Sequence, residues 1–230
     1  MTGFPPRGNS IKEKVLSSIT DKIQYLELMP GERIDENTIE KEIGASRTPR
    51  REAMMLLEVE GLVNIYPQKG TFVSLIDLNL IREIIYLRFS VENRVFSDLA
   101  LSNIPVSSDV EKYLLIQELA VKNNDFIEFI KNDYQFHKEL FRLGGHLEVW
   151  NMIEGKLIHC TRFRILGWKT FHDEFELTLE EHKKLIEYIK SGNINELSQT
   201  LTHHHDYELK RYADKLVEKF PDFFTSNTLE

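Results

Sequence analysis

The sequence has very little cysteine and no long run of apolar residues. Its single cysteine, Cys160, cannot form an internal disulfide, which favours a reducing cytoplasm. No stretch of about 18 consecutive apolar residues is present, which argues against a membrane span. The first twelve residues contain no apolar core, so we expect no secretory signal.

The charge balance is acidic, with a formal net charge of −8. Taken over the whole chain, this argues against a nucleic-acid partner. The acid is unevenly spread, however. Residues 1–75 hold 10 basic and 11 acidic residues, and residues 76–230 hold 19 and 26. Because salt screens charges beyond roughly 10 Å at 0.1 M, a basic cluster can still bind DNA locally. Residues 47–51 form such a cluster, with three arginines and no acid.

A chain of 230 residues, 41% hydrophobic and 29% charged, is long enough for one large or two ordinary globular domains. Apolar residues every four positions predict a helix over residues 11–25. A short helix fits 36–43, where Asp35 can cap its start and Gly44 can end it. A third helix opens near Pro49 and stops at Gly61.

Two β-prone stretches, 62–66 and 71–75, follow the third helix with a turn between them. Three helices and then a hairpin predict a winged helix-turn-helix domain in residues 1–75. A recognition helix presents its N-terminal end to base edges in the major groove, and arginine suits both guanine and phosphate. The wing tip can approach the DNA backbone closely through a glycine. The candidate DNA-binding residues are Arg47, Thr48, Arg50, Arg51, Lys69 and Gly70.

These motifs together resemble the DNA-binding domain of GntR-family bacterial transcription regulators, over roughly residues 11–75. The resemblance implies that Arg47, Thr48 and Arg51 contact bases and phosphates, and that Gly70 lies at the wing tip. One departure is Arg50, which stands where the family usually has an apolar residue. The segments that carry the resemblance are Pro30-Gly31, Glu36-x-x-Ile39, Ser46-Arg47-Thr48-Pro49-x-Arg51-Glu52-Ala53, Leu57-Glu58-x-Glu60-Gly61-Leu62-Val63 and Gly70-Thr71-x-Val73.

Residues 76–230 show helical periodicity almost throughout and few strand signals. They predict an all-α antiparallel helical bundle, so the fold class is mainly α. The breaks between helices include Gly144-Gly145, His172-Asp173 and Gly192-Asn193. The expected helices span residues 78–102, 108–123, 125–143, 147–168, 175–191 and 193–217.

Four ionisable residues lie on apolar faces of three of these helices. Asp133 and His137 share a face with Ile130 and Leu140, while His182 and His204 lie on apolar faces of two later helices. Burying such groups without partners costs several kcal/mol. Each could be a core residue satisfied by its neighbours, or all four could bind one metal ion such as zinc, nickel or manganese. By their helical angle, His203 and His205 are not expected to be ligands.

The pattern Asp133-x-x-Phe136-His137, then Glu181-His182, then His204 is similar to the helical effector domain of the FadR-like GntR subgroup, the FCD domain. The similarity covers about residues 78–217. It implies that Asp133, His137, His182 and His204 bind one divalent ion. It also implies a small carboxylate effector, clamped by Arg88 in Leu87-Arg88-x-x-x-Glu92, with Arg162 and then Arg164 as further candidates.

Two alternatives stay open at this stage. The metal could serve a helical metal-dependent enzyme acting on a small carboxylate, although no general base can be assigned. It could also be purely structural in a domain that only dimerises. The reading we favour is a homodimeric, non-enzymatic regulator that binds double-stranded operator DNA, most commonly as a repressor, and does not contact a membrane.

Overall fold

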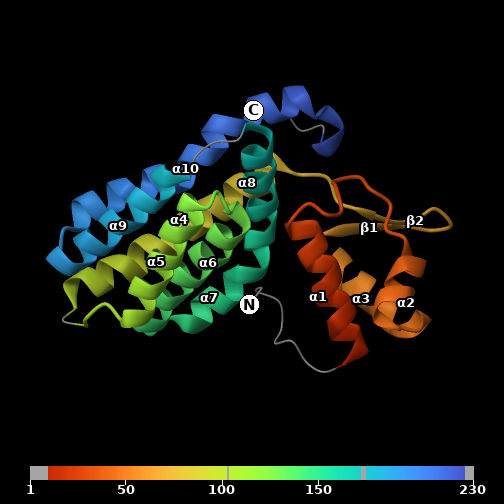
Figure 1. The fold of residues 1–230 in the computed structure, drawn as a ribbon, viewed down its shortest axis with the longest axis horizontal. Coiled ribbons are helices and arrows are strands. Elements are labelled where there is room, and N and C mark those ends of the chain that lie inside the picture. The colour runs from red at the N-terminus through yellow and green to blue at the C-terminus, as the bar shows by residue number, and fades with distance from the viewer. Residues whose placement is uncertain (1–9, 103, 172–174, 226–230) are drawn as a thin grey trace. The chain divides into compact units, whose positions relative to one another are not determined.

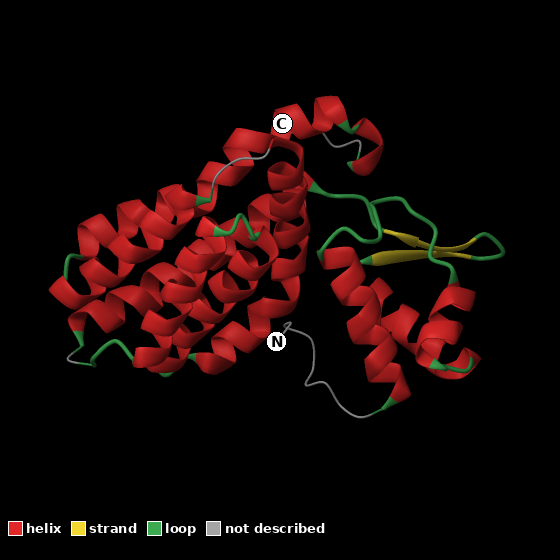
Figure 2. Ribbon diagram, viewed as in Figure 1, coloured by secondary structure: helices red, strands yellow, loops and turns green. Residues whose placement is uncertain are grey.

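The computed structural model describes residues 10–102, 104–171 and 175–225. In these residues the fold is mainly helical, with one small two-stranded sheet (Figure 2). Contacts within the chain define two compact units, which we describe separately. The winged unit contains the described residues up to 81, residues 154–166 and those from 215 onward; the helical unit contains residues 82–153 and 167–214.

Three short helices form the first part of the winged unit: α1 (Ile11–Gln24), α2 (Glu36–Ile43) and α3 (Arg47–Val59). Ser10 and Glu13 form a reciprocal capping box at the start of α1. Asp35 caps α2 through the backbone N–H of Asn37, and Gly44 ends it in the left-handed conformation. The helices α1 and α2 begin at their predicted residues, α3 begins two residues before Pro49, and the predicted caps of α2 are confirmed.

The wing consists of β1 (Val63–Tyr66) and β2 (Gly70–Val73), which pair antiparallel with Val63 opposite Val73. The segment before α2 adds a third element beside β2. There the N–H of Ile34 donates to the carbonyl of Thr71 at 2.8 Å, and Arg33 forms a bridge with Phe72. The three helices and the hairpin confirm the predicted winged helix-turn-helix.

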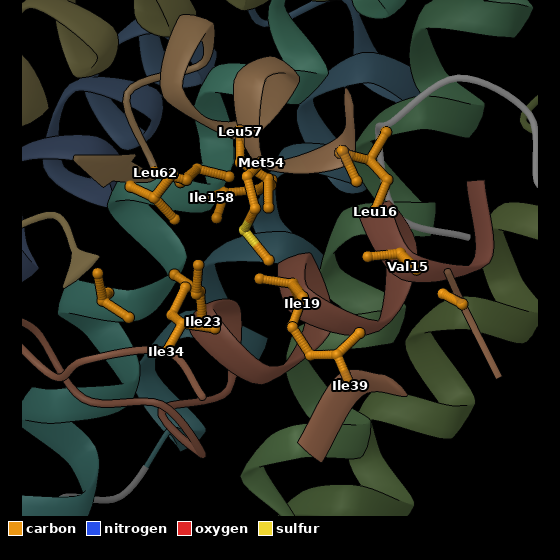
Figure 3. Packing of buried hydrophobic residues seen from close by; sticks show 14 residues of the cluster. Val15, Leu16, Ile19, Ile23, Ile34, Ile39, Met54, Leu57, Leu62 and Ile158 are labelled. Carbon is orange, nitrogen blue, oxygen red and sulfur yellow. The ribbon is translucent and has the colours of Figure 1, made fainter. Parts of the chain in front are cut away.

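The core of the winged unit includes one side chain from far along the chain. Apolar residues of α1 to α3 and of the wing surround Ile158, which belongs to α8 (Leu157–Phe171), as Figure 3 shows. On the same helix, Arg162 donates to the backbone carbonyls of Ser74 and Leu75 at 2.8 and 2.7 Å. These contacts explain why residues 154–166 belong to the winged unit although they lie beyond the predicted boundary at residue 75.

The helical unit, residues 82–153 and 167–214, contains most of the remaining helices but only the end of α8 (Figure 1). Within it, α5 packs against α6 and α9. None of the helices in the described residues is long and apolar enough to cross a membrane. The helices are α4 (Leu78–Leu101), α5 (Ser108–Lys122), α6 (Phe126–Leu143), α7 (Leu147–Ile153), α8, α9 (Glu176–Ser191) and α10 (Ile194–Lys219), with 3₁₀ turns at Glu154–Lys156 and Pro221–Phe223.

One predicted helix is wrong. The expected single helix over 147–168 is two helices, α7 and α8, separated by the 3₁₀ turn Glu154–Lys156. Gly155 at the centre of this turn weakens a continuous helix because glycine loses the most backbone freedom on folding. The predicted break at His172-Asp173 lies outside the described residues.

Candidate functional site

Two arginines on the first turns of α3 present free charges to solvent. Arg47 is the first residue of α3 and Arg51 lies one turn later, and both side chains are exposed. Within the described residues neither forms a hydrogen bond or an ion pair. Thr48 beside them is exposed as well. Two free guanidinium groups and a hydroxyl at a helix N-terminus are available to phosphates and base edges.

Arg50 takes a different role from the predicted DNA contact. Its side chain is buried, and its Nη1 lies 2.9 Å from Oε2 of Glu40 and donates to the carbonyl of Glu36. Both partners belong to α2. A buried guanidinium that already has a carboxylate partner has little charge to offer to DNA. We therefore correct this assignment: Arg50 ties α3 to α2.

The wing turn holds Lys69, whose side chain is exposed, and Gly70, whose φ is +112°. This backbone conformation favours glycine. A Cβ atom at position 70 would lie 2.9 Å from Nε of Arg33. Gly70 therefore also makes room for the Arg33 guanidinium, a residue that the sequence analysis did not select. Only the pairing of residues 31–34 with β2 brings Arg33 to the wing.

The structure brings all four predicted metal ligands together in the interior of the helical unit. Asp133 and His137 come from α6, His182 from α9 and His204 from α10, and all four are buried. One ligand atom from each lies within 4.8 Å of the others. Nε2 of His182 is 3.3 Å from Nε2 of His137 and 3.2 Å from Oδ1 of Asp133.

The second ring nitrogen of each histidine faces an oxygen acceptor from another helix. A carboxylate or amide oxygen can only accept, so Nδ1 must carry the hydrogen and Nε2 keeps its lone pair. Gln117 is oriented for this role because its Nε2 donates to the carbonyl of Asn132 at 3.1 Å. The three contacts are His182–Gln117 at 2.6 Å, His204–Glu181 at 3.0 Å and His137–Glu92 at 3.2 Å.

These donors fit a divalent transition metal. Two lone pairs that face each other at 3.3 Å, as those of His137 and His182 do, repel unless a cation lies between them. Ligand atoms about 2.1 Å from a tetrahedral or octahedral ion lie roughly 3.0–3.4 Å apart at neighbouring positions. The donor set of three imidazoles and one carboxylate suits zinc, nickel or manganese. The outer acceptors would hold each ring in orientation.

Carboxylates held in their charged form adjoin the cluster. Burial acts to raise the pKa of Glu92, but Arg88 and the histidines outweigh it and hold that pKa well below its ordinary value. Burial likewise acts to raise the pKa of Glu181, and the hydrogen bond from His204 outweighs it, so that pKa is lowered. Asp133 adds a third carboxylate to this region and is itself buried. A divalent cation would stabilise buried negative charge of this kind.

Burial disfavours the charged form of three histidines in this region. Burial lowers the pKa of His137 to about 3, against the opposing charge of Glu92. Burial also lowers the pKa values of His204 and His205. All three rings are therefore neutral near pH 7. His205 donates to Oε2 of Glu92 at 2.8 Å, and the half-exposed His203 bonds to Glu181, so both serve as outer partners.

The predicted effector arginines lie in different surroundings. Nε of Arg88 is 2.7 Å from Oε1 of Glu92, the carboxylate oxygen that also faces His137. Arg162 is 1% exposed and holds the chain after β2 in the winged unit. Arg162 is therefore a structural residue in this fold, and its contacts give no support to an effector role. Arg164 is buried.

Comparison with known proteins identifies the family. The family described as "Bacterial regulatory proteins, gntR family" matches residues 11–73, and the FCD domain matches residues 84–207, which is more than half of the chain. The chain belongs to the GntR family of regulators and carries an FCD domain. It is a transcription regulator and not an enzyme.

Curated relatives of this regulator carry the same kind of description. An HTH-type transcriptional regulator from an unstable DNA locus of Streptomyces ambofaciens is 28% identical over 96% of this chain and 92% of its own length. The gluconate operon transcriptional repressor of Bacillus subtilis is 28% identical over 76% of this chain and 74% of its own. The HTH-type transcriptional repressor RspR of Escherichia coli is 23% identical, with 94% of both chains covered.

Solved structures show the same fold. A GntR transcriptional regulator from Rhodococcus sp. RHA1 superposes with a TM-score of 0.73 at 20% identity, covering 88% of this chain and 97% of the other. McbR/YncC of Escherichia coli also has a TM-score of 0.73, at 18% identity, covering 93% and 100%. At these identities the likeness concerns the fold alone.

Proposed function

We propose that this regulator is a homodimeric, cytoplasmic repressor whose binding to operator DNA is modulated by a small organic acid at a metal site in its FCD domain. The observation that carries the proposal is the convergence of Asp133, His137, His182 and His204 in one buried cluster. Two curated relatives are named repressors, which supports the sign of regulation.

The DNA end of the proposal rests on α3. The free guanidinium groups of Arg47 and Arg51 would contact base edges and phosphates, with Thr48 beside them and Lys69 at the wing. A symmetric dimer reads a palindrome, so the operator would have twofold symmetry.

The effector part of the proposal is based on Glu92. One oxygen of Glu92 contacts both Arg88 and His137, which we propose as a metal ligand. A bound divalent ion with an open coordination position would accept one carboxylate of the effector. Arg88 would then clamp the other end of that molecule through its guanidinium. An effector can act only by binding the DNA-competent and DNA-incompetent states with different affinity.

Elemental analysis of the purified, untagged protein tests the metal site. We expect about one transition-metal ion per chain in the wild type and none in His182→Ala/His204→Ala, which loses two of the four ligands. The control, His146→Ala, removes an exposed histidine that does not belong to the ligand cluster. Full metal occupancy in the His182/His204 variant would refute the assignment of these residues as metal ligands.

Thermal denaturation with a panel of mono-, di- and tricarboxylates tests the effector. Carboxylates that raise the melting temperature of the metal-loaded wild type should fail to do so in the His182/His204 variant and act weakly in Arg88→Gln. A shift of equal size in the metal-free variant would place the effector elsewhere. If no metal is found under metal-replete conditions, apolar or acyl effectors become the better candidates, and the DNA-binding assignment is unaffected.

A further inference from the structure

The wing has an outer face, on the side of the sheet away from the core. Paired residues on neighbouring antiparallel strands point to the same face, and successive residues alternate between faces. Phe72 pairs with Asn64 on β1 and with Arg33 on the other side, while Tyr66 pairs with Gly70. The alternate positions Val63, Thr71 and Val73 are buried. The outer face therefore carries Arg33, Asn64, Tyr66 and Phe72.

This outer face offers hydrogen-bond donors and no acid. Residues 61–76 contain neither aspartate nor glutamate, in a chain with 37 acidic residues. Asn64 is exposed, and the Tyr66 side chain is 49% exposed with its ring against Phe72. Arginine, asparagine and tyrosine are side chains that donate to phosphate oxygens in protein–DNA contacts.

Glu36 lines the same hollow as Arg33 and Gly70, and two other acids around this face are engaged elsewhere. Asp35 accepts from the backbone N–H of Asn37 and from the Thr38 hydroxyl, each at 2.9 Å. Glu58 accepts from the backbone N–H of Ile65 at 2.9 Å. Both carboxylates therefore serve local backbone structure.

Arg33 is the cation of the outer face. Its side chain is exposed, and in the described residues it has no hydrogen bond and no ion pair. Its guanidinium lies against Gly70, where a Cβ would be 2.9 Å from Nε and 3.3 Å from Nη2. The absence of a side chain at position 70 thus lets the charge lie beside the wing turn, close to Lys69.

We propose that the outer face of the wing is a second DNA contact, in which Arg33 binds the phosphate backbone with Asn64 and Tyr66 beside it. This contact adds to the α3 contacts and rests on the proposed DNA-binding function. Because phosphates carry no sequence information, it contributes affinity to every duplex and does not select bases.

Fluorescence anisotropy against salt concentration tests this contact. The probes are a duplex selected by the wild type from a random-sequence library and an unrelated duplex. Each phosphate contact contributes about 0.9 to the slope of log K against log salt, so Arg33→Gln should lower the slope by about that amount. It should also weaken binding to both duplexes by about tenfold.

Lys14→Gln is the matched control, because Lys14 is exposed on α1 and also loses one positive charge. We expect it to leave the slope unchanged. Gly70→Ala should lower the slope as Arg33→Gln does, since a methyl group there displaces the guanidinium. Tyr66→Phe should weaken binding by only about two- to fivefold, because it removes a neutral donor.

The outcomes separate this inference from the proposed function. If the wild type selects DNA but Arg33→Gln shows the same slope as Lys14→Gln, the outer-face contact is refuted while operator binding stands. If the wild type selects no duplex, the proposed function fails and the contact fails with it. Thermal unfolding of Arg33→Gln should match the wild type, because Arg33 is exposed and unpaired in the described chain. Gly70→Ala should unfold at a lower temperature, because a φ of +112° is unfavourable for alanine, so its DNA binding is compared at a temperature where it is fully folded.

Discussion

Charged side chains cluster both at the start of α3 and in the interior of the helical unit, but the two clusters differ in solvent exposure and in hydrogen-bond partners. At α3, Arg47 and Arg51 are exposed and lack partners among the described residues. In the helical unit, Glu92 and Asp133 are buried, and Glu92 accepts from Arg88 and His205 and lies 3.2 Å from Nδ1 of His137.

This difference reflects the partner that each region suits. An exposed free charge costs little before binding, and its attraction to DNA falls as salt rises. A buried charge is expensive unless each of its hydrogen-bonding positions is filled, so its surroundings must be preorganised. The start of α3 therefore suits reversible binding of a macromolecule such as DNA, and the buried cluster of the helical unit suits a tightly bound ion.

The largest effect is expected from substitutions at the start of α3, which should weaken DNA binding without changing the metal site of the helical unit. Arg47→Ala combined with Arg51→Ala should weaken binding to the selected duplex by roughly 10²–10³-fold, because each arginine–base pair contributes about 1–3 kcal/mol. The metal content should not change. Anisotropy and elemental analysis of the same preparation measure both.

Arg50→Met is the control for that experiment within the same helix. Because Arg50 is paired with Glu40 and buried, its loss should lower the free energy of unfolding by about 1–3 kcal/mol. The salt slope of the folded variant should equal that of the wild type. A slope reduced as strongly as in the Arg47/Arg51 variant would return Arg50 to the DNA contacts.

A smaller effect is expected at the metal site. Glu92→Gln keeps an oxygen for His137 but places an amide N–H₂ among the donors of Arg88 and His205. Loss of such an outer partner typically costs about 10–100-fold in metal affinity. Calorimetric titration of the metal-free protein with Ni²⁺ measures the affinity, and the absorption bands of Co²⁺ report altered ligand geometry.

Glu139→Gln provides the comparison for Glu92→Gln. Glu139 is also a buried carboxylate, but it pairs with Arg142 and accepts from Ser107. Its variant should bind Ni²⁺ with wild-type affinity and give unchanged Co²⁺ bands. If both variants lose the same affinity, general destabilisation and not Glu92 accounts for the loss.

The smallest effect concerns the acid stability of the winged unit. Burial lowers the pKa of His159 from 6.5 to about 4, while its Nε2 contacts the carbonyl of Glu60 at 3.1 Å. Between these pH values the unfolded chain binds a proton that the folded chain does not, so stability falls as the pH falls. One such histidine contributes at most about 1.4 kcal/mol per pH unit.

Urea unfolding between pH 7 and pH 4.5 measures this dependence. His159→Gln should be less stable at pH 7, because it changes a buried contact, but its stability should fall less steeply as the pH is lowered. His146→Ala, which removes an exposed histidine, should keep the wild-type pH dependence. An unchanged dependence in His159→Gln would show that His159 does not contribute to it.

Local patterns predicted much of the architecture. The caps at Asp35 and Gly44 define α2, and apolar spacing placed α1 and most helices within a few residues. The four predicted ligands converge because each lies on an apolar helical face, and apolar faces turn toward a shared interior. Periodicity did not reveal the 3₁₀ turn at Gly155, since one glycine within an apolar pattern is compatible with a continuous helix.

The sequence by itself determined the mainly helical class, the winged module and the arginine-rich start of α3, because these depend on neighbours a few residues apart. It also placed each of the four candidate ligands on an apolar helical face. Tertiary structure alone decided which charges are satisfied. Glu40 neutralises Arg50, Gln117 orients His182, and the wing brings Arg33 to its outer face. Each of these partners lies ten or more residues away, and only packing brings them within hydrogen-bonding or van der Waals distance.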